Sequence, residues 1–185
     1  MPKKISANKK KVTSYHSLHT RSLEGDITAY DEWAKDYDKD ASNWGYKAPD
    51  IACAKLISML QSANKNGKLK VWDIGCGTGL TAEALLKITP ENIQFEVLSS
   101  DFSQAMLNVS ENKKIYDRLV LNDLNSENLK DKFDAIISTG AFIQGHLKLE
   151  ILLNVVEKNL LKNGVMSIST RSSYWNDNLS EKLNA

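Results

Sequence analysis

Val71-Trp-Asp-Ile-Gly-Cys-Gly-Thr-Gly-Leu80 is the stretch of sequence that decides the fold. The apolar residues at its start predict the end of a buried strand, and apolar residues recur at helical spacing from Leu80 to Ile88. The three glycines therefore lie on a strand-to-helix turn. Because glycine has no Cβ and readily adopts positive φ, a ligand can approach this backbone closely, and Asp73 at the strand end faces the same crevice. The stretch predicts a cofactor-binding turn.

The spacing of the glycines distinguishes this turn from a dinucleotide site. The dinucleotide fingerprint is Gly-x-Gly-x-x-Gly, whereas this chain reads Gly-x-Gly-x-Gly soon after Asp73. An aspartate there would repel a pyrophosphate, but it suits a ligand with a positive charge and an ammonium group. S-adenosylmethionine is such a ligand, and residues 73–79 resemble the first motif of the class I S-adenosylmethionine-dependent methyltransferases. The alternative is an ordinary glycine-rich turn, since an isolated glycine pattern is a weak signal.

Length and charge predict one domain with a basic N-terminal segment. The chain has 185 residues, 42% of them hydrophobic, which suffices for a sizeable core. The net charge of +1 carries no nucleic-acid signature, but six of the 24 basic residues precede the first acid, Glu24. These six are Lys3, Lys4, Lys9, Lys10, Lys11 and Arg21. We predict a basic, disordered arm over residues 1–25, with nucleic-acid contact or targeting as alternatives.

Cysteine usage and hydropathy predict an intracellular protein. Cys53 and Cys76 are the only cysteines, and neither has histidine or cysteine neighbours at metal-ligand spacing. We expect two reduced thiols, no metal site and a reducing compartment. No run of residues is long and apolar enough to span a membrane. The expected location is the cytoplasm, and the basic arm leaves the nucleus and the mitochondrion open.

The segment before the glycine turn predicts an N-terminal helical cap over residues 26–66. Residues 26–40 have an aromatic face at helical spacing, formed by Tyr30, Trp33, Ala34 and Tyr37. This face either packs on the body of the domain or forms a lid whose tyrosines contact a sulfonium. Residues 42–46 predict a loop, and Pro49 starts a second helix. The apolar face expected for that helix is Ile51, Ala54, Ile57, Met59 and Leu60.

Strands and helices alternate regularly from residue 67 to residue 171. The predicted strands are the one ending at Asp73, Ile93–Leu98, Arg118–Leu121, Phe133–Ser138 and Val165–Thr170. A helix is expected over Lys148–Leu161, with Asn163-Gly164 as its C-terminal cap. This order predicts an α/β, Rossmann-like domain whose parallel sheet of about five strands carries helices on both faces. Residues 172–185 form a short C-terminal tail.

Polar residues follow the second and third predicted strands. Asp101 stands where a Rossmann-type domain holds a ribose diol, because a carboxylate accepts two hydrogen bonds. Phe102 is placed to stack on adenine. Asn122 and Asp123 are placed to bind the adenine edge, and a simple turn is the alternative for them.

Several segments resemble the Williams-Beuren syndrome region methyltransferase-like proteins, over roughly residues 26 to 171. The segments are Tyr30-Asp-Glu-Trp-Ala-Lys-Asp-Tyr-Asp38, Tyr46-Lys-Ala-Pro49, Asp73-Ile-Gly-Cys-Gly-Thr-Gly-Leu80, Asp101-Phe-Ser-Gln-Ala-Met-Leu107, Ile115-Tyr-Asp-Arg-Leu119, Phe133-Asp-Ala-Ile-Ile-Ser-Thr-Gly140, Gly145-His146 and Thr170-Arg171. The resemblance implies a class I methyltransferase fold that uses S-adenosylmethionine. It implies that Asp73, Gly75 and Gly77 lie near the methionine moiety, Asp101 on the ribose and Asp123 near adenine.

Tyr37, Cys76, Phe102 and Thr139 complete the predicted cofactor-binding set. The class I fold normally adds a helix and an antiparallel strand pair after the fifth strand, and residues 172–185 are too few for these. We therefore expect a shortened member or a fragment whose open sheet edge can pair with another chain, as in a homodimer.

The predicted reaction is in-line transfer of the sulfonium methyl to a small-molecule or protein acceptor, with catalysis mainly by positioning. His146, the only histidine beyond residue 25, is the candidate proton acceptor, and a structural or capping role is its alternative. The chain has no Asn-Pro-Pro-Tyr motif after the fourth strand, which argues against methylation of nucleic-acid bases by that route. A non-catalytic methyltransferase-like binding module, acting through protein-protein contact, is the rival interpretation. A nicotinamide-dependent oxidoreductase is a second rival, which the glycine spacing disfavours.

Overall fold

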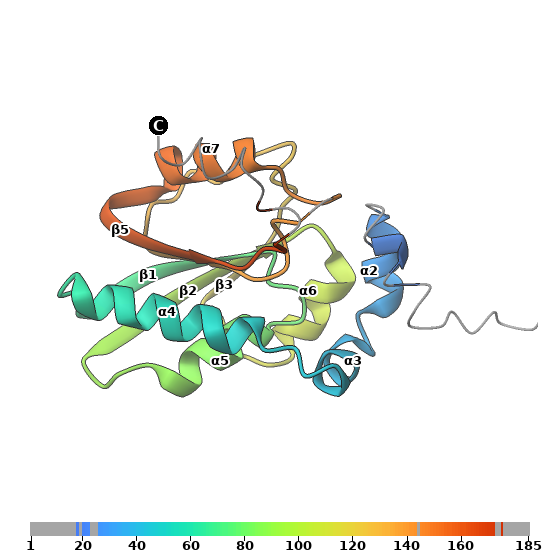
Figure 1. Cartoon of the computed structure of the whole chain (residues 1–185), viewed down its shortest axis with the longest axis horizontal. Coiled ribbons are helices and arrows are strands. Elements are labelled where there is room, and N and C mark those ends of the chain that lie inside the picture. The colour runs from blue at the N-terminus through green and yellow to red at the C-terminus, as the bar shows by residue number, and fades with distance from the viewer. Residues whose placement is uncertain (1–17, 19, 23–25, 144, 173–174, 176–185) are drawn as a thin grey trace, which may run out of the picture.

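The computed structural model describes residues 18, 20–22, 26–143, 145–172 and 175 (Figure 1). The helices are α2 (Ile27–Trp33), α3 (Tyr37–Asn43), α4 (Ala48–Ser62), α5 (Leu80–Ile88), α6 (Gln104–Glu111) and α7 (Leu149–Asn159). The strands are β1 (Gly67–Ile74), β2 (Ile93–Asp101), β3 (Arg118–Leu121), β4 (Phe133–Ser138) and β5 (Leu160–Ile168).

The strands form one sheet in the order β3-β2-β1-β4-β5, and every neighbouring pair is parallel. The predicted parallel sheet is thereby confirmed. β1 pairs with β2 on one side and with β4 on the other, so Asp73 stands opposite both Ser99 and Ile137. The chain order reverses at this point, where open α/β sheets form a crevice beyond the carboxyl ends of their strands. The glycine turn after β1 lies at this crevice.

Two apolar cores hold the sheet between helices, one on each face of the sheet. Figure 1 shows α4 and α5 on one face and α7 on the other. Successive residues of a strand point to opposite faces. Val71 accordingly packs in the core that contains Leu56 of α4, whereas Trp72 packs in the core that contains Leu152 and Val155 of α7. All five of these side chains are essentially inaccessible to solvent.

Helices α2 and α3 form a cap with a small apolar cluster of its own. Leu18, Ala29 and Trp33 are buried together, and the ring centroids of Trp33 and Tyr37 lie 4.8 Å apart. Leu18 belongs to the predicted basic arm, yet it packs in this cluster, and residues 20–22 are helical. Leu18 and residues 20–22 thus belong to ordered structure beside α2. The rest of the predicted arm, residues 1–17, 19 and 23–25, lies outside the described residues.

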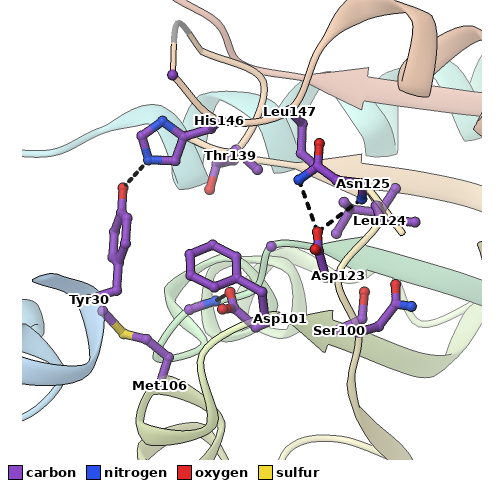
Figure 2. A pocket seen from close by; sticks show the side chains of 18 of the residues that line it. Tyr30, Ser100, Asp101, Met106, Asp123, Leu124, Asn125, Thr139, His146 and Leu147 are labelled. Carbon is purple, nitrogen blue, oxygen red and sulfur yellow. Dashed lines mark hydrogen bonds between the residues drawn. The ribbon is translucent and has the colours of Figure 1, made fainter. Parts of the chain in front are cut away.

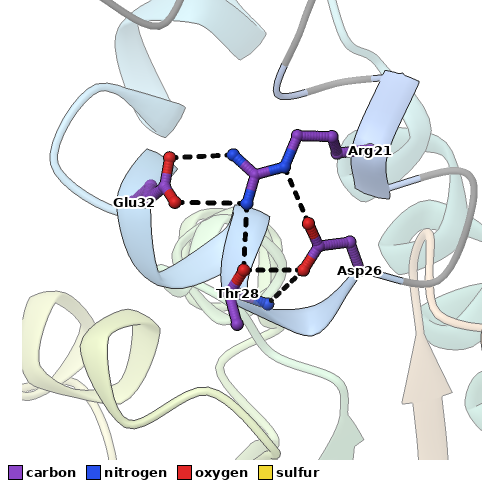
Figure 3. Close-up of polar contacts among 4 residues, drawn as sticks. All are labelled: Arg21, Asp26, Thr28 and Glu32. Atoms are coloured by element: carbon purple, nitrogen blue, oxygen red, sulfur yellow. Dashed lines mark hydrogen bonds and ion pairs between the residues drawn. The ribbon is translucent and has the colours of Figure 1, made fainter. Parts of the chain in front are cut away.

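Arg21 ties the end of the predicted arm to α2 (Figure 3). Its Nε donates to Oδ2 of Asp26 at 2.7 Å, and its Nη1 donates to Oε2 of Glu32 at 2.9 Å. Asp26 is the N-cap of α2 and accepts a hydrogen bond from the backbone N–H of Thr28. The hydrogen bond to Glu32 raises the pKa of Arg21 above its ordinary value. The hydrogen bond from Thr28 lowers the pKa of Asp26 below its ordinary value. These contacts fix the start of the cap.

The N-terminal helices differ from the predicted pattern in two ways. First, the helix expected over residues 26–40 is interrupted by a turn at residues 34–36, where the backbone N–H of Asp36 donates to the carbonyl of Trp33. α3 then continues to Asn43, although a loop was predicted from residue 42. In α4 the expected apolar residues Ile51 and Ala54 are exposed. Ala52, Cys53 and Leu56 are buried instead, because α4 packs on the sheet. Within the range 26–66 that we predict as a helical cap, α4 packs against the sheet.

The junction of α7 and β5 also differs from the prediction. Helix α7 ends at Asn159, whose side-chain amide donates to the carbonyls of Leu129 and Asp131. Leu160 already pairs with Phe133, and the register shifts before the regular pairing at residue 165. Asn163 has φ +64°, so Asn163-Gly164 lies in an irregular part of β5 and does not cap the helix. Of the predicted tail, only residues 172 and 175 are described.

Candidate cofactor site

A cavity of about 320 Å³ lies beyond the carboxyl ends of β1, β2 and β4, against the cap (Figure 2). This volume is in the range of about 300–1,000 Å³ that is typical of small-molecule sites. The lining residues are Tyr30, Tyr37, Ile74, Gly75, Gly77, Ser100, Asp101, Phe102, Met106, Asn122, Asp123, Leu124, Asn125, Thr139, Gly140, Ala141, Gly145, His146 and Leu147. The cavity therefore lies at the position where the sheet topology predicts a ligand.

The glycines of the turn serve two separate purposes. Gly75 and Gly77 both have left-handed φ, +65° and +54°. A Cβ on Gly75 would lie 2.6 Å from the Cβ of Ala141, so packing within the protein requires glycine there. A Cβ on Gly77 would meet no protein atom within 4 Å. Since Gly77 lines the cavity, its missing side chain leaves room for a ligand.

Asp101 is fixed by backbone hydrogen bonds from both sides. Its Oδ2 accepts from the N–H of Gly77 at 2.8 Å, and its Oδ1 accepts from the N–H of Ser103 at 2.9 Å. Ser103 also caps α6 and donates to Asp31 of the cap at 2.5 Å. Burial raises the pKa of Asp101, although the backbone donors oppose this shift. Each carboxylate oxygen retains acceptor capacity, so Asp101 is a preorganised acceptor on the cavity wall.

Asp73 adds a second buried carboxyl behind the glycine turn. It is 1% exposed, and neither of its oxygens has a hydrogen-bond partner among the described residues. Burial raises the pKa of Asp73 to about 8, and the charge of Asp101 acts in the same direction. Two neighbouring buried carboxyls are stabilised by a cationic ligand, because a positive charge lowers the cost of their ionisation. The electrostatics of the site therefore favour a cation.

One side of the cavity consists of the residues after β3. Asn125 donates to Oδ1 of Asp123 from its backbone N–H and from its side-chain amide, each at 2.9 Å. Asn122 donates to the carbonyl of Glu127, while its Oδ1 is buried without a partner among the described residues. Leu124 adds an apolar surface. This side can bind a flat, polar-edged ring.

The opposite side consists of a tyrosine and a histidine. Figure 2 shows Tyr30 and His146 across the cavity from Asp123, with Asp101 between the two sides. The phenol oxygen of Tyr30 lies 2.7 Å from Nε2 of His146. Thr139 lies on the same wall as His146, and its hydroxyl bonds that of Thr81 at 2.6 Å. The cavity thus has a ring-binding side, a central carboxylate and a polar aromatic side.

Most of the residues predicted from sequence meet at this cavity. Those lining it are Tyr37, Gly75, Gly77, Asp101, Phe102, Asp123, Thr139 and His146. Asp73 and Cys76 do not line it: Asp73 lies within β1, and the Sγ of Cys76 turns toward the carbonyl of Gly77. Burial raises the pKa of both the Cys76 thiol and the Tyr37 phenol. The roles of all ten residues in ligand binding stay predictions.

Sequence patterns did not indicate the apolar lining. Met106 comes from α6, and Leu124 and Leu147 come from segments without periodic hydrophobicity. Met106 lies in the quoted segment 101–107, and Leu124 and Leu147 had no signal beyond closeness in sequence to Asp123 and His146. Within the described ranges, no group of metal-ligating side chains is present. No helix among those residues has the length and hydrophobicity needed to cross a bilayer.

Comparison with solved structures identifies the class of fold. The chain is 25% identical to a S-adenosylmethionine-dependent methyltransferase from Clostridium acetobutylicum, with a TM-score of 0.58 over 78% of this chain and 58% of that chain. A TehB-like SAM-dependent methyltransferase from Corynebacterium glutamicum is 20% identical, with a TM-score of 0.60 over 84% of this chain and 83% of that chain. The second likeness shows the fold alone. The chain has the class I methyltransferase fold.

Comparison of sequences identifies the family. The family model of the methyltransferase small domain matches residues 38–183, and the chain belongs to that family. It is 31% identical to methyltransferase-like protein 27 of Homo sapiens over 160 residues, which cover 84% of this chain and 62% of that protein. It is 26% identical to ubiquinone biosynthesis O-methyltransferase of Bradyrhizobium diazoefficiens over 126 residues, 68% of this chain and 49% of that protein. The chain spans less than two thirds of either relative.

Proposed function

We propose that the chain binds S-adenosylmethionine in this cavity and transfers its methyl group to a small-molecule or protein acceptor. One observation carries the proposal: the Cβ-free residue Gly77 and the buried carboxylate of Asp101 face the same cavity and are hydrogen-bonded to each other. This pairing leaves space for a ligand beside an acceptor for a sugar diol. Membership in the methyltransferase small domain family supports the same conclusion.

The shape of the cavity suits the parts of the cofactor in their covalent order. Asp123 and Asn122 would bind the amino group of adenine, because they offer acceptor oxygens beside the apolar Leu124. Asp101 would accept hydrogen bonds from the two ribose hydroxyls. The sulfonium follows the ribose in the molecule, so it would lie toward Tyr30 and His146. The carboxyl of Asp73, which is buried behind the glycine turn, would interact electrostatically with the positive charge of the methionine end across the backbone of that turn.

The chain's own contribution to catalysis is mainly positioning and exclusion of water. A sulfonium supplies a strong electrophile when it is bound, so the protein needs to align the acceptor and keep the site dry. Met106, Leu124 and Leu147 give the cavity apolar walls. The cap covers the cavity through Tyr30 and Tyr37, and His146 is the candidate proton acceptor.

Isothermal titration calorimetry with S-adenosylmethionine, S-adenosylhomocysteine and NAD tests this proposal. We expect both adenosyl ligands to bind at one site per chain and NAD not to bind. Absence of adenosyl binding by the folded protein would remove the proposal, and preferential NAD binding would favour an oxidoreductase. Binding without methyl transfer across a broad acceptor screen would favour the non-catalytic module.

The edge strand of the sheet bears on the oligomeric state of the protein. β5 is the last strand on its side of the described sheet, and an unpaired strand edge can accept a strand from a second copy. We propose a homodimer on this basis, which sedimentation equilibrium would test.

The segments around Tyr30 and Gly145-His146 support the Williams-Beuren region subgroup. The two buried free thiols, Cys53 and Cys76, support a cytoplasmic location.

A further inference from the structure

The contact between Tyr30 and His146 joins two elements that are far apart in the sequence. Tyr30 belongs to α2, and His146 belongs to the segment after β4, 116 residues later. The phenol oxygen and Nε2 lie 2.7 Å apart, and the two rings are nearly perpendicular, with centroids 5.5 Å apart. The rings of Tyr30 and Phe102 also make a T-shaped contact, with centroids 5.7 Å apart. The phenol is therefore held against the imidazole at the cavity wall (Figure 2).

The hydrogen bond between Tyr30 and His146 can run in either direction, because a phenol and a neutral imidazole can each donate or accept. Burial raises the pKa of Tyr30 to about 12, so the phenol keeps its proton at neutral pH. In the arrangement in which the phenol donates, Nε2 of His146 is unprotonated and the imidazole proton is on Nδ1. A second hydrogen bond, with the hydroxyl of Ser22, favours negative charge on the same phenol oxygen. A phenol oxygen has two lone pairs, so one remains for a group in the cavity.

The position of the pair is defined relative to the other polar groups. Asp123 and Asp101 mark the adenine and ribose positions of the proposed function, on which this inference rests. Tyr30 lies on the far side of Asp101 from Asp123 (Figure 2). Because the sulfonium follows the ribose, the methyl group and the attacking atom of the acceptor would lie beside the phenol. Nε2 of His146 is engaged by the phenol, and both Tyr30 and His146 line the cavity.

We propose that Tyr30 is a catalytic residue that takes the proton of the methyl acceptor and passes its own proton to His146. The acceptor's electron pair forms the bond to the methyl carbon, and the pair of the broken carbon–sulfur bond stays on sulfur. The acceptor's proton moves to the phenol oxygen while the phenol proton moves to Nε2. The products are a methylated acceptor, S-adenosylhomocysteine, a neutral Tyr30 and an imidazolium at His146, which returns its proton to water. His146 acts through Tyr30 and does not touch the acceptor.

Sinefungin tests the position of the phenol without knowledge of the acceptor. This analogue of S-adenosylmethionine carries a protonated amine in place of the methyl-bearing sulfonium, so its N–H groups point where the methyl would be. S-adenosylhomocysteine has nothing at that position and serves as the reference ligand. Calorimetry with both ligands would compare the wild type with Tyr30→Phe. The matched control is Tyr116→Phe, because Tyr116 is a partly buried tyrosine that does not line the cavity.

We expect Tyr30→Phe to weaken sinefungin binding about tenfold or more, since it removes a hydrogen bond to a charged donor, and to leave S-adenosylhomocysteine binding within about twofold. Tyr116→Phe should leave the ratio of the two affinities unchanged. An unchanged ratio in Tyr30→Phe, or an equal loss in Tyr116→Phe, would overturn the inference. If the wild type binds neither ligand, the proposed function itself fails, so the two failures are distinguishable.

The tautomer of His146 provides a second test that needs neither a cofactor analogue nor an acceptor. The ¹⁵N chemical shifts of labelled histidines at pH 8 should show Nδ1 protonated and Nε2 unprotonated in the His146 ring. In Tyr30→Phe the Nε2 shift should change while the Nδ1 assignment stays the same. A wild-type His146 with its proton on Nε2 would contradict the relay, because the phenol then has no base to receive its proton.

Discussion

Gly77 offers a direct way to separate ligand contact from backbone strain. An alanine at this position would keep φ near +54°, a left-handed conformation that costs about 1–2 kcal/mol for a residue with a Cβ. For a domain of this size, that loss lowers the melting temperature by about 2–8 °C. The new Cβ would meet no protein atom within 4 Å, so the protein itself has room for it. The strain therefore reduces stability without blocking folding.

Binding should suffer far more than stability. The Cβ of Gly77→Ala would enter the cavity beside Asp101, where the adenosyl group is proposed to lie. Overpacking of a close contact costs about 1–3 kcal/mol, which corresponds to a loss of about 5- to 150-fold in affinity for S-adenosylhomocysteine. Gly67→Ala is the matched control, since Gly67 has φ +74° and equally open surroundings but lies at the other end of β1.

Calorimetry and thermal melting of the two variants give a clear outcome. Both should melt at similarly reduced temperatures, and only Gly77→Ala should lose affinity for S-adenosylhomocysteine. Equal affinities for Gly77→Ala and the wild type would refute the reasoning, because the ligand would then not approach the turn. Equal losses in both variants would show that the loss of binding is a consequence of lowered stability.

Three other predictions concern the supports of the site. Leu56→Ala should reduce the free energy of unfolding by about 2–5 kcal/mol, because Leu56 is buried. Ile51→Ala on the same helix should change it by less than about 0.5 kcal/mol, because Ile51 is exposed. Equal effects of the two substitutions in urea denaturation would contradict the observed orientation of α4. The pKa of Asp73 is raised from 3.8 to about 8, so the folded protein binds this proton more tightly than the unfolded chain does. The free energy of unfolding should therefore fall as the pH rises from about 4 to about 8, by at most about 1.4 kcal/mol per pH unit. Asp73→Asn should remove this part of the slope, and identical pH profiles would refute the assignment. Lys113 bonds Asp38 of α3 at 2.8 Å, so Lys113→Met should speed amide exchange in α3 more than in β1, and uniform exchange would count against that anchor.

The sheet could be predicted from sequence because its signals are local. β3 and β4 begin and end where the pattern of apolar residues predicted, and the turn after β1 followed from the glycines together with the apolar strand and helix patterns that flank them. The carboxyl ends of parallel strands meet at one edge, so Asp101 and Asp123 could be assigned to a common crevice without knowledge of any contact. Eight of the ten predicted site residues line that crevice, and all of them except Tyr37 of α3 lie at or after the end of a strand.

The errors arise where long-range packing decides the structure. The sequence of α4 has apolar residues on more than one face, and the sheet selects Leu56 over Ile51. Asn163-Gly164 is a common helix-capping pair, but pairing of Leu160 with Phe133 had already begun the strand. The hydrogen bond between Tyr30 and His146 spans 116 residues, and no local pattern signals such a contact. Tertiary contacts of this kind are invisible to periodicity.

A crystal structure of the protein with S-adenosylhomocysteine tests the central claim most directly. The measured quantities are the distances from the ribose hydroxyls to the Asp101 carboxylate and from the adenine amino group to Asp123. We predict hydrogen-bond distances of about 2.6–3.2 Å at both places, with the ribose in contact with the Cα of Gly77. A ligand bound elsewhere, with Asp101 facing only protein or solvent, would contradict the account.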